Sequence, residues 1–256
     1  MSFQISSPKG AITTLDEWFD RAGPKGGKEH WVPGRSAMES ARAWCPDAGP
    51  CVPAEIRALL DSIPALAGAE ISAVYPERKV RFDELRGEPR NADVAAVAEH
   101  PEGRIAISIE AKADEPFDRP VREVLMAIDA RIAEGERSNG RLRVEQLVSA
   151  LLPAGTSAEA LRYQLLTAAA GAIAFAAEQQ ATRAVLIVHE FVSDATNAER
   201  RATNQTDLDR FLAAISAGRF HELSAGRLVG PIAIPGAPLF DGPVPLFVGK
   251  SVRRLD

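Results

Sequence analysis

Two acidic residues and a lysine lie around a stretch that is typical of a β-hairpin. Proline and glycine occupy the second and fourth positions of the segment His100–Gly103, which suits a type I turn, and alternating β-branched residues flank it. If His100 faces Gly103, the antiparallel register places Asp93 opposite Glu110. The spacing therefore predicts that two carboxylates share one face of the hairpin.

That arrangement requires positive charge near the two carboxylates. Opposed side chains in an antiparallel pair have Cβ atoms about 4.5–5.5 Å apart, so like charges there destabilise the sheet. A hard divalent cation with oxygen ligands would offset the repulsion. Lys112, two residues beyond Glu110, adds a positive charge on the same face. A bulge at the turn would shift the pairing by one residue and separate the carboxylates, and the sequence leaves this alternative open.

The two faces of the predicted hairpin differ in character. The face with the acidic residues otherwise holds the small residues Ala95, Ala106 and Ser108. The other face is apolar and can pack against a helix. Its expected pairs are Val94 with Ile109, Ala96 with Ile107, and Ala98 with Ile105. We therefore expect one core side and one side that carries the chemistry.

An aspartate followed at this distance by Glu-x-Lys resembles the core motif of the PD-(D/E)xK phosphodiesterase superfamily, the restriction-endonuclease-like nucleases. The matching positions are Asp93, Glu110 and Lys112; alanine stands directly before Asp93, and the nearest upstream proline is Pro89. The resemblance implies that Asp93 and Glu110 bind one or two Mg²⁺ (or Mn²⁺) ions. It also implies that Lys112 helps to orient and activate the water that cuts a phosphodiester.

The order of the predicted elements is consistent with an α/β fold of the restriction-endonuclease-like class, a mixed β-sheet with a central hairpin flanked by helices. Besides the hairpin, the patterns predict strands over 71–75, 79–84 and 184–188. They predict helices over 13–22, 36–44, 53–62, 120–133, 144–152 and 156–180, and a last helix that ends at 217. Capping patterns at 36–39, 156–159 and 206–209 mark three of the helix starts.

We expect one domain over residues 1–256, with its core at about 36–192. The helices within about 119–152 form an insertion, and the proline-rich segment of about 226–256 forms edge strands and a covering arm. Cys45 and Cys51 are too few for a disulfide framework or a zinc site. No apolar stretch reaches about 18 residues without polar interruption, so we expect a soluble, cytoplasmic protein without membrane contact.

Several further residues are candidates for accessory roles. Glu39 is either the capping partner of Ser36 or an additional carboxylate of the metal site. Gln164 and Arg162 lie early in a predicted helix and could contact phosphate. The acids of the loop after Lys112, Asp114 and Glu115, could reach the site or could be ordinary turn residues, and His189 is expected to be structural.

The net charge of −5 argues against broad attraction to nucleic acid but leaves room for a local basic groove. A mixed basic stretch before the hairpin could meet phosphates or form a solvated strand face: Arg78, Lys79, Arg81, Arg86 and Arg90.

We therefore expect a Mg²⁺- or Mn²⁺-dependent endonuclease or exonuclease that acts on nucleic acid, with DNA as the expected partner, and that can work as a homodimer. Two alternatives remain. The chain could be a catalytically inert binding or regulatory module of the same fold. Alternatively, the hairpin could be plain scaffold, in which case Glu110 and Lys112 should be solvent-exposed and no pocket should open over Asp93.

Overall fold

The structure is a computed structural model that describes residues 3–242 and 245–255. Within these ranges it is a mixed α/β fold with an eight-stranded mixed sheet and seven α-helices. The strands are β1 (Gln4–Ser7), β2 (Gly10–Ile12), β3 (Glu70–Val80), β4 (Arg90–Glu99), β5 (Ile105–Lys112), β6 (Arg183–Val192), β7 (Arg227–Ile232) and β8 (Leu246–Arg254). The helices are α1 (Leu15–Ala22), α2 (Ser36–Trp44), α3 (Ala54–Asp61), α4 (Val121–Ala133), α5 (Gly140–Leu151), α6 (Tyr163–Glu178) and α7 (Ala198–Ile215), with a short 3₁₀ helix, η1 (Gly27–His30).

The strands follow the spatial order β2-β1-β3-β4-β5-β6-β8-β7. β4 is antiparallel to both β3 and β5, whereas β5, β6 and β8 run parallel to one another. The long crossover from β5 to β6 contains α6, as a parallel pair requires. The ends of β5, β6 and β8 therefore lie at one edge of the sheet, next to the start of β4.

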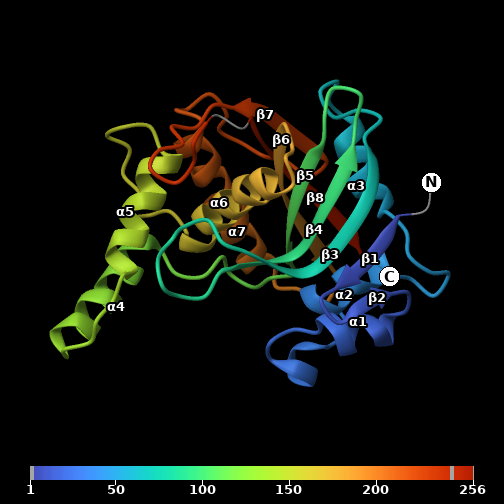
Figure 1. The fold of residues 1–256 in the computed structure, drawn as a ribbon. Coiled ribbons are helices and arrows are strands. Elements are labelled where there is room, and N and C mark those ends of the chain that lie inside the picture. Colours follow the sequence, from blue (N-terminus) through green and yellow to red (C-terminus); the bar gives the residue numbers. More distant parts are fainter. Residues whose placement is uncertain (1–2, 243–244, 256) are drawn as a thin grey trace.

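Helices cover both faces of the sheet (Figure 1). α6 packs on β4, β5 and β6, and α7 packs on α6. On the opposite face α2 and α3 contact β5, β6 and β8. α4 and α5 project from the body of the molecule. None of the helices in the described ranges combines the length and the apolar character that crossing a bilayer requires.

The register predicted for the hairpin is confirmed. Val94 pairs with Ile109, Ala96 with Ile107 and Ala98 with Ile105. The Gly103 amide donates to the carbonyl of His100 at 3.0 Å, which closes the turn without a bulge between these pairs. The alternative one-residue shift is therefore wrong.

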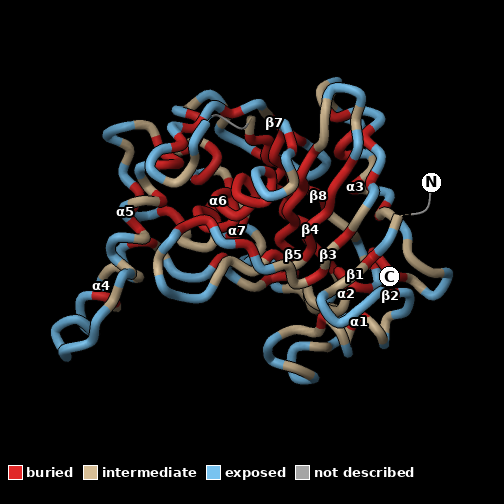
Figure 2. The backbone as a smooth tube through the Cα atoms, in the orientation of Figure 1, coloured by how far each residue is buried: buried red, intermediate tan, exposed pale blue. Residues whose placement is uncertain are grey.

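The two faces of the hairpin join two separate apolar clusters. Both of its strands, β4 and β5, are buried along most of their length (Figure 2). The six residues of the predicted apolar face pack with Trp44, Ile56 and Leu59 of α2 and α3. The small residues of the other face lie against the alanine-rich α6, whose residues 165–176 are all buried. Small side chains on both surfaces let helix and sheet approach closely, so the face expected to carry the chemistry is covered by α6 along most of its length.

The sheet differs from the prediction between residues 70 and 89. We predicted two strands separated near Pro76, but β3 is continuous through this residue and no strand follows Val80 before Arg90. Pro76 causes no break because it stays paired with Val94 of β4. The irregularities of β3 lie on either side of it: the register with β4 shifts between Ile71 and Ala73, and Glu77 has a φ of 49°.

Two helix starts predicted from capping patterns are wrong. α6 begins at Tyr163 because the segment before it pairs with the start of α4: the Tyr163 amide donates to the Arg119 carbonyl at 3.1 Å, and the Val121 amide donates to the Leu161 carbonyl at 2.9 Å. α7 begins at Ala198 with Asn197 as its cap, so residues 206–209 lie inside it. Polar residues inside α7 were mistaken for a helix start.

The proline-rich C-terminal segment is more integral to the sheet than predicted. β7 is an edge strand, as expected, but β8 lies between β6 and β7 and pairs with β6 over nine residues. Most of β8 is buried. The segment therefore completes the core instead of merely covering it. The two cysteines are free thiols, Cys45 buried and Cys51 exposed.

The turn that sets the hairpin register offers a test of this packing. Gly103 has a φ of 107°, and a Cβ atom there would lie 2.8 Å from Cγ2 and Oγ1 of Thr182. We expect Gly103→Ala to lower the free energy of unfolding by about 1–3 kcal/mol more than Gly135→Ala does. Gly135 also has a positive φ, of 88°, but a Cβ there meets no atom within 4 Å. Urea unfolding of both variants measures the difference, and equal losses would contradict the close contact at the turn.

Candidate metal-binding and catalytic site

The site forms where β4 and β5 separate. Their backbone pairing ends at Val94 and Ile109, one residue before Asp93 and Glu110. Beyond that point Oδ2 of Asp93 accepts a hydrogen bond from the Ala111 amide at 2.7 Å. The side chain of Asp93 therefore takes the place of a backbone carbonyl, and its carboxylate is held in the gap between the two strands.

Glu110 is buried beside this gap and is held by three side chains. Its residue exposure is 2%, and that of Lys112 is 7%. The Lys112 ammonium lies 3.1 Å from Glu110 Oε1, and both Arg90 and Gln164 donate to the Glu110 carboxylate. Lys112 also donates to Oε1 of Gln164 at 3.1 Å. Gln164, the second residue of α6, thus links the glutamate and the lysine of the motif.

Charge balance in the site is uneven. Burial raises the pKa of Asp93 to about 8, and the nearby charge of Glu110 adds to the rise. Burial also raises the pKa of Glu77 to about 7, against the hydrogen bond that Asn91 donates to it. Burial alone would raise the pKa of Glu110, but the charges of Arg90 and Lys112 outweigh it and hold that pKa below its usual value. The positively charged side chains, Arg90 and Lys112, both lie at Glu110. Asp93 and Glu77 have too little positive charge nearby to ionise fully at neutral pH.

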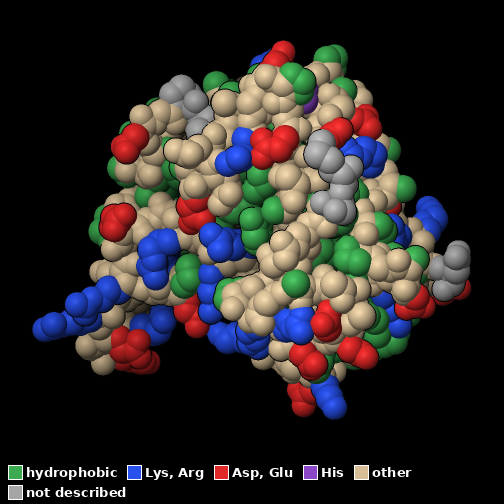
Figure 3. All heavy atoms as spheres, turned by 45° about the vertical axis from the view of Figure 1, so that its right-hand side comes forward, with side chains coloured by type: hydrophobic (Ala, Val, Ile, Leu, Met, Phe, Trp, Pro, Cys, Tyr) green, Lys and Arg blue, Asp and Glu red, His purple; other side chains and the backbone are tan. Residues whose placement is uncertain are grey.

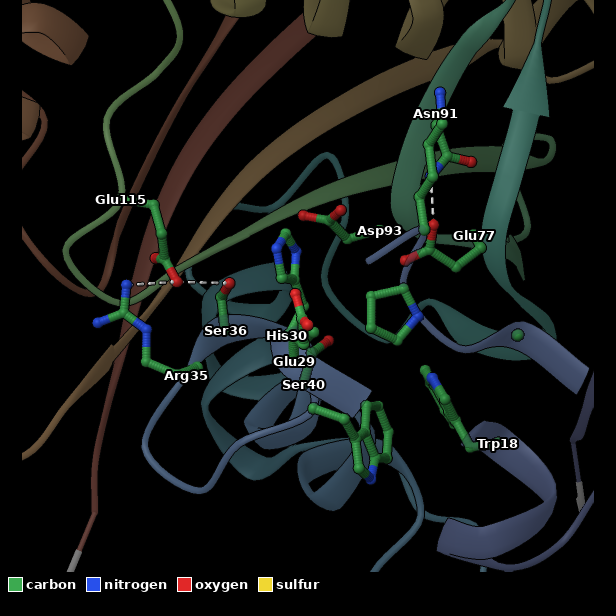
Figure 4. A pocket seen from close by; sticks show the side chains of 15 residues that line it. Trp18, Glu29, His30, Arg35, Ser36, Ser40, Glu77, Asn91, Asp93 and Glu115 are labelled. Atoms are coloured by element: carbon green, nitrogen blue, oxygen red, sulfur yellow. Dashed lines mark hydrogen bonds and ion pairs between the residues drawn. The ribbon is translucent and has the colours of Figure 1, made fainter. Parts of the chain in front are cut away.

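A pocket of about 450 Å³ opens over Asp93 on the side of α1 and α2 (Figure 4). We call it the α2-side pocket. Glu77, Asn91 and Asp93 line it from the sheet, and Glu115 lines it from the loop after β5. Its other walls include Trp18, His30, Arg35, Ser36 and Ser40. Glu115 accepts from Ser36 at 3.1 Å and lies 3.0 Å from Arg35, so the loop after β5 is tied to α2.

A second pocket, of about 420 Å³, opens on the other side of the sheet end. We call it the α6-side pocket. Arg90, Lys112 and Gln164 line it, together with Asp118 and Tyr163. The motif residues are therefore reached from two sides, Asp93 from the α2-side pocket and Lys112 from the α6-side pocket.

The plain-scaffold alternative predicted an exposed Glu110–Lys112 pair and no pocket over Asp93. The structure shows a buried pair and a pocket, so these two observations contradict it.

Glu39 is not among the residues that line either pocket. Its Oε1 accepts from the Gly34 amide and from Arg42, each at 2.8 Å. The predicted capping pair is also wrong, because α2 begins at Ser36 and the hydroxyl of Ser36 bonds to Glu115. Glu39 instead stabilises the turn that leads into α2.

The remaining candidates have structural partners. Arg162 pairs with Asp207 at 2.6 Å and donates to the Asp118 carbonyl. Asp114 pairs with Arg35 at 2.7 Å and accepts from the Asn197 amide. His189 is fully buried, with Nε2 2.9 Å from Glu55, as expected for a structural histidine.

Glu77 is the one pocket residue with a strongly raised pKa that the sequence did not indicate. It lies in β3 next to the Pro76–Val94 and Arg78–Ala92 pairs, which places it beside Asp93. Pro76 suggested a break between two strands, and the continuous strand that brings Glu77 to the site was therefore missed. Of the basic stretch before the hairpin, Arg90 pairs with Glu110, and Arg86 lines a separate pocket beside α4 and α5.

Comparison with known proteins gives a family for this chain. The profile of a domain of unknown function, DUF6946, matches residues 11–246. The chain belongs to the DUF6946 family. No curated protein and no solved structure matches it.

The donor chemistry of this DUF6946 site suits a hard cation. Asp93, Glu77 and Glu110 offer carboxylate oxygens, which Mg²⁺ and Mn²⁺ prefer, and the raised pKa of Asp93 marks an acid without a sufficient positive partner. Their present geometry is not that of a finished metal centre. Within residues 3–242 and 245–255, no group of three or more His, Cys, Asp or Glu side chains is placed to hold a metal ion. Arg90, at the Glu110 carboxylate, supplies the charge that a cation would bring.

The raised pKa of Asp93 predicts how the stability of the protein changes with pH. The folded protein binds this proton more tightly than the unfolded chain, whose aspartate has an ordinary pKa of 3.8, so stability is lost as the pH rises from about 4 to about 8. Asparagine cannot ionise and keeps an oxygen for the Ala111 amide. In metal-free buffer we expect Asp93→Asn to raise the melting temperature by at least about 2 °C near pH 9 and by less near pH 5.

Circular dichroism melts of the two proteins measure this difference. Asp47→Asn is the matched control, because Asp47 is an exposed loop residue and the change in formal charge is the same. If Asp93→Asn is less stable than the wild type at every pH, or if its gain in melting temperature does not grow with pH, the pKa of Asp93 is not raised in the folded protein.

Proposed function

We propose that this DUF6946 protein is a metal-dependent nuclease that hydrolyses phosphodiester bonds, with DNA as its substrate. The observation that carries the proposal is the meeting of Asp93, Glu110 and Lys112 at the separating ends of β4 and β5, between two pockets. Gln164 supports it further, because this helix residue contacts both the glutamate and the lysine.

The fold supports the same proposal at a coarser level. A mixed sheet with a central hairpin, flanked by helices on both faces, is what the resemblance to restriction-endonuclease-like proteins implies. The parallel strand β6 follows β5 through the crossover that contains α6. We propose that the chain has the restriction-endonuclease-like fold, with α6 bringing Gln164 to the motif.

Asp93 and Glu110 would hold the metal, and Mg²⁺ or Mn²⁺ suits their hard oxygen donors. When bound, such an ion lowers the pKa of a bound water and neutralises charge that develops on the scissile phosphate. Arg90 pairs with Glu110 in the structure, so a metal held by this carboxylate would have to displace its guanidinium. Arg90 also lines the α6-side pocket, where a displaced guanidinium would be placed to contact a phosphate.

The chain's own residues then orient the reaction. Lys112 is held by Glu110 and Gln164, so its ammonium keeps a defined direction at the wall of the α6-side pocket. From there it positions the attacking water and stabilises negative charge on the phosphate. Glu77, on the wall of the α2-side pocket beside Asp93, offers a further carboxylate, and a cation nearby would favour its charged form.

A catalytically inert binding module of the same fold is the second candidate. The ion pair between Arg90 and Glu110 favours it, because this pair already satisfies the buried carboxylate. The two candidates differ in one respect that can be measured: the nuclease binds a divalent cation at Asp93 and Glu110, and the inert module does not.

Isothermal titration of Mn²⁺ separates the two candidates. We expect the wild type to bind Mn²⁺ and both Asp93→Asn and Glu110→Gln to weaken binding at least about tenfold, because each loses one anionic ligand. Cleavage of a labelled DNA duplex should fall at least about 100-fold in both variants. Asp47→Asn should match the wild type in both assays, and circular dichroism should show that each variant is folded. Wild-type Mn²⁺ affinity retained in the site variants, or no cleavage by a wild type that binds the metal, would contradict the proposed nuclease.

A further inference from the structure

Five arginines surround a pocket between the projecting helices and the body of the molecule. The pocket measures about 710 Å³ and is formed by α4, α5, the loop that joins them and the loop between β3 and β4. We call it the arginine groove. Its basic residues are Arg86, Arg119, Arg131, Arg137 and Arg143. No acidic side chain is among the described residues that line it, although the whole chain has a net charge of −5.

Most of these guanidinium groups are free to bind a ligand. Arg86, Arg131 and Arg137 are exposed, and within the described part of the chain their side chains have no ion pair or hydrogen-bond partner. Arg119 is also exposed, with Asp118 no closer than 3.9 Å. Arg143 differs, because two hydrogen bonds to Asp83, of 2.7 and 3.1 Å, fix it as part of the wall. Uncompensated arginines gathered in one hollow repel one another, and a bound polyanion removes that repulsion.

The arginine groove leads to the motif residues. Tyr163, the first residue of α6, lines both the arginine groove and the α6-side pocket. Its neighbour Gln164 contacts Lys112 and Glu110 directly. Figure 3 shows Lys and Arg side chains gathered where the helical projection meets the body. A bound polyanion could therefore extend from α4 and α5, past Tyr163, to Lys112.

We infer that the arginine groove binds the phosphate backbone of a nucleic-acid strand and directs it into the candidate active site. Guanidinium groups match phosphate oxygens in geometry and are always charged, and repeated phosphates match a row of arginines better than a single anion does. The predicted insertion, α4 and α5, thereby acquires a role in substrate binding. The inference rests on the proposed function, since it supplies the path by which a substrate reaches Lys112.

Fluorescence anisotropy tests the arginine groove without requiring catalysis. The full chain is titrated into fluorescein-labelled DNA, as single strand and as duplex, and into RNA of the same sequence, all in EDTA. The variant Arg131→Glu with Arg137→Glu changes two exposed groove residues. The matched control, Arg219→Glu with Arg227→Glu, makes the same change in net charge at exposed positions around β7, away from the groove.

We expect the groove variant to lose at least about tenfold in affinity and its plot of log Kd against log salt to become shallower by about two, one for each phosphate contact removed. The control should lose much less. Equal losses in the two variants, or no binding of any nucleic acid by the wild type, would overturn the inference.

A cleavage assay in Mn²⁺ separates this inference from the proposed function. If groove-dependent binding is found in EDTA but the wild type cuts no substrate, the arginine groove stands and the nuclease proposal fails. If the wild type hydrolyses a small phosphodiester such as bis-p-nitrophenyl phosphate but binds no strand, the nuclease site stands and the groove inference fails. Asp93→Asn should bind nucleic acid as the wild type does and should not cut it.

Discussion

A charged group in the interior of a protein is costly unless it is paired and hydrogen-bonded, and the buried charge on which this structure depends is that of Glu110. Its carboxylate is buried between β5 and α6 and is matched by Arg90, Lys112 and Gln164. These partners come from β4, β5 and α6, so one charged group holds together the hairpin and the helix that covers it. Removing either positive partner would leave a buried charge without compensation, which is a costly state.

Asp93 lies in β4, one residue beyond the last β4–β5 pair, as Glu110 does in β5, and its negative charge has fewer positive partners. The separation of β4 and β5 leaves the Ala111 amide without a strand partner, and the Asp93 carboxylate accepts it. That contact fixes the position of the acid but brings only one donor, while burial and Glu110 raise the pKa of Asp93 to about 8. We propose that a bound cation balances Asp93 and replaces Arg90 at Glu110. We also propose that the arginine groove, whose positive charge is largely unpaired, binds a polyanion.

Local patterns in the sequence predicted the center of this structure well. The turn His100–Gly103 and the alternating residues beside it determine a register, and the structure has that register. Gln164, an accessory candidate early in a predicted helix, contacts both Glu110 and Lys112. The errors arose where distant segments decide the outcome. α6 starts late because residues before Tyr163 pair with the start of α4, and β3 continues through Pro76 because β4 lies beside it. Glu77 could not be predicted, and of the arginine groove only Arg86 could be, because both sites depend on residues brought together from separate elements.

The central claim is that Asp93 and Glu110 together form a cation site. A crystal structure grown with Mn²⁺, with an anomalous difference map, tests it most directly. If the two carboxylates bind a cation, the map has an anomalous peak between them, with oxygen ligands at about 2.1 Å, and the Arg90 guanidinium has left Glu110. A map without a peak there, in which Arg90 still pairs with Glu110, would show that they do not form a cation site.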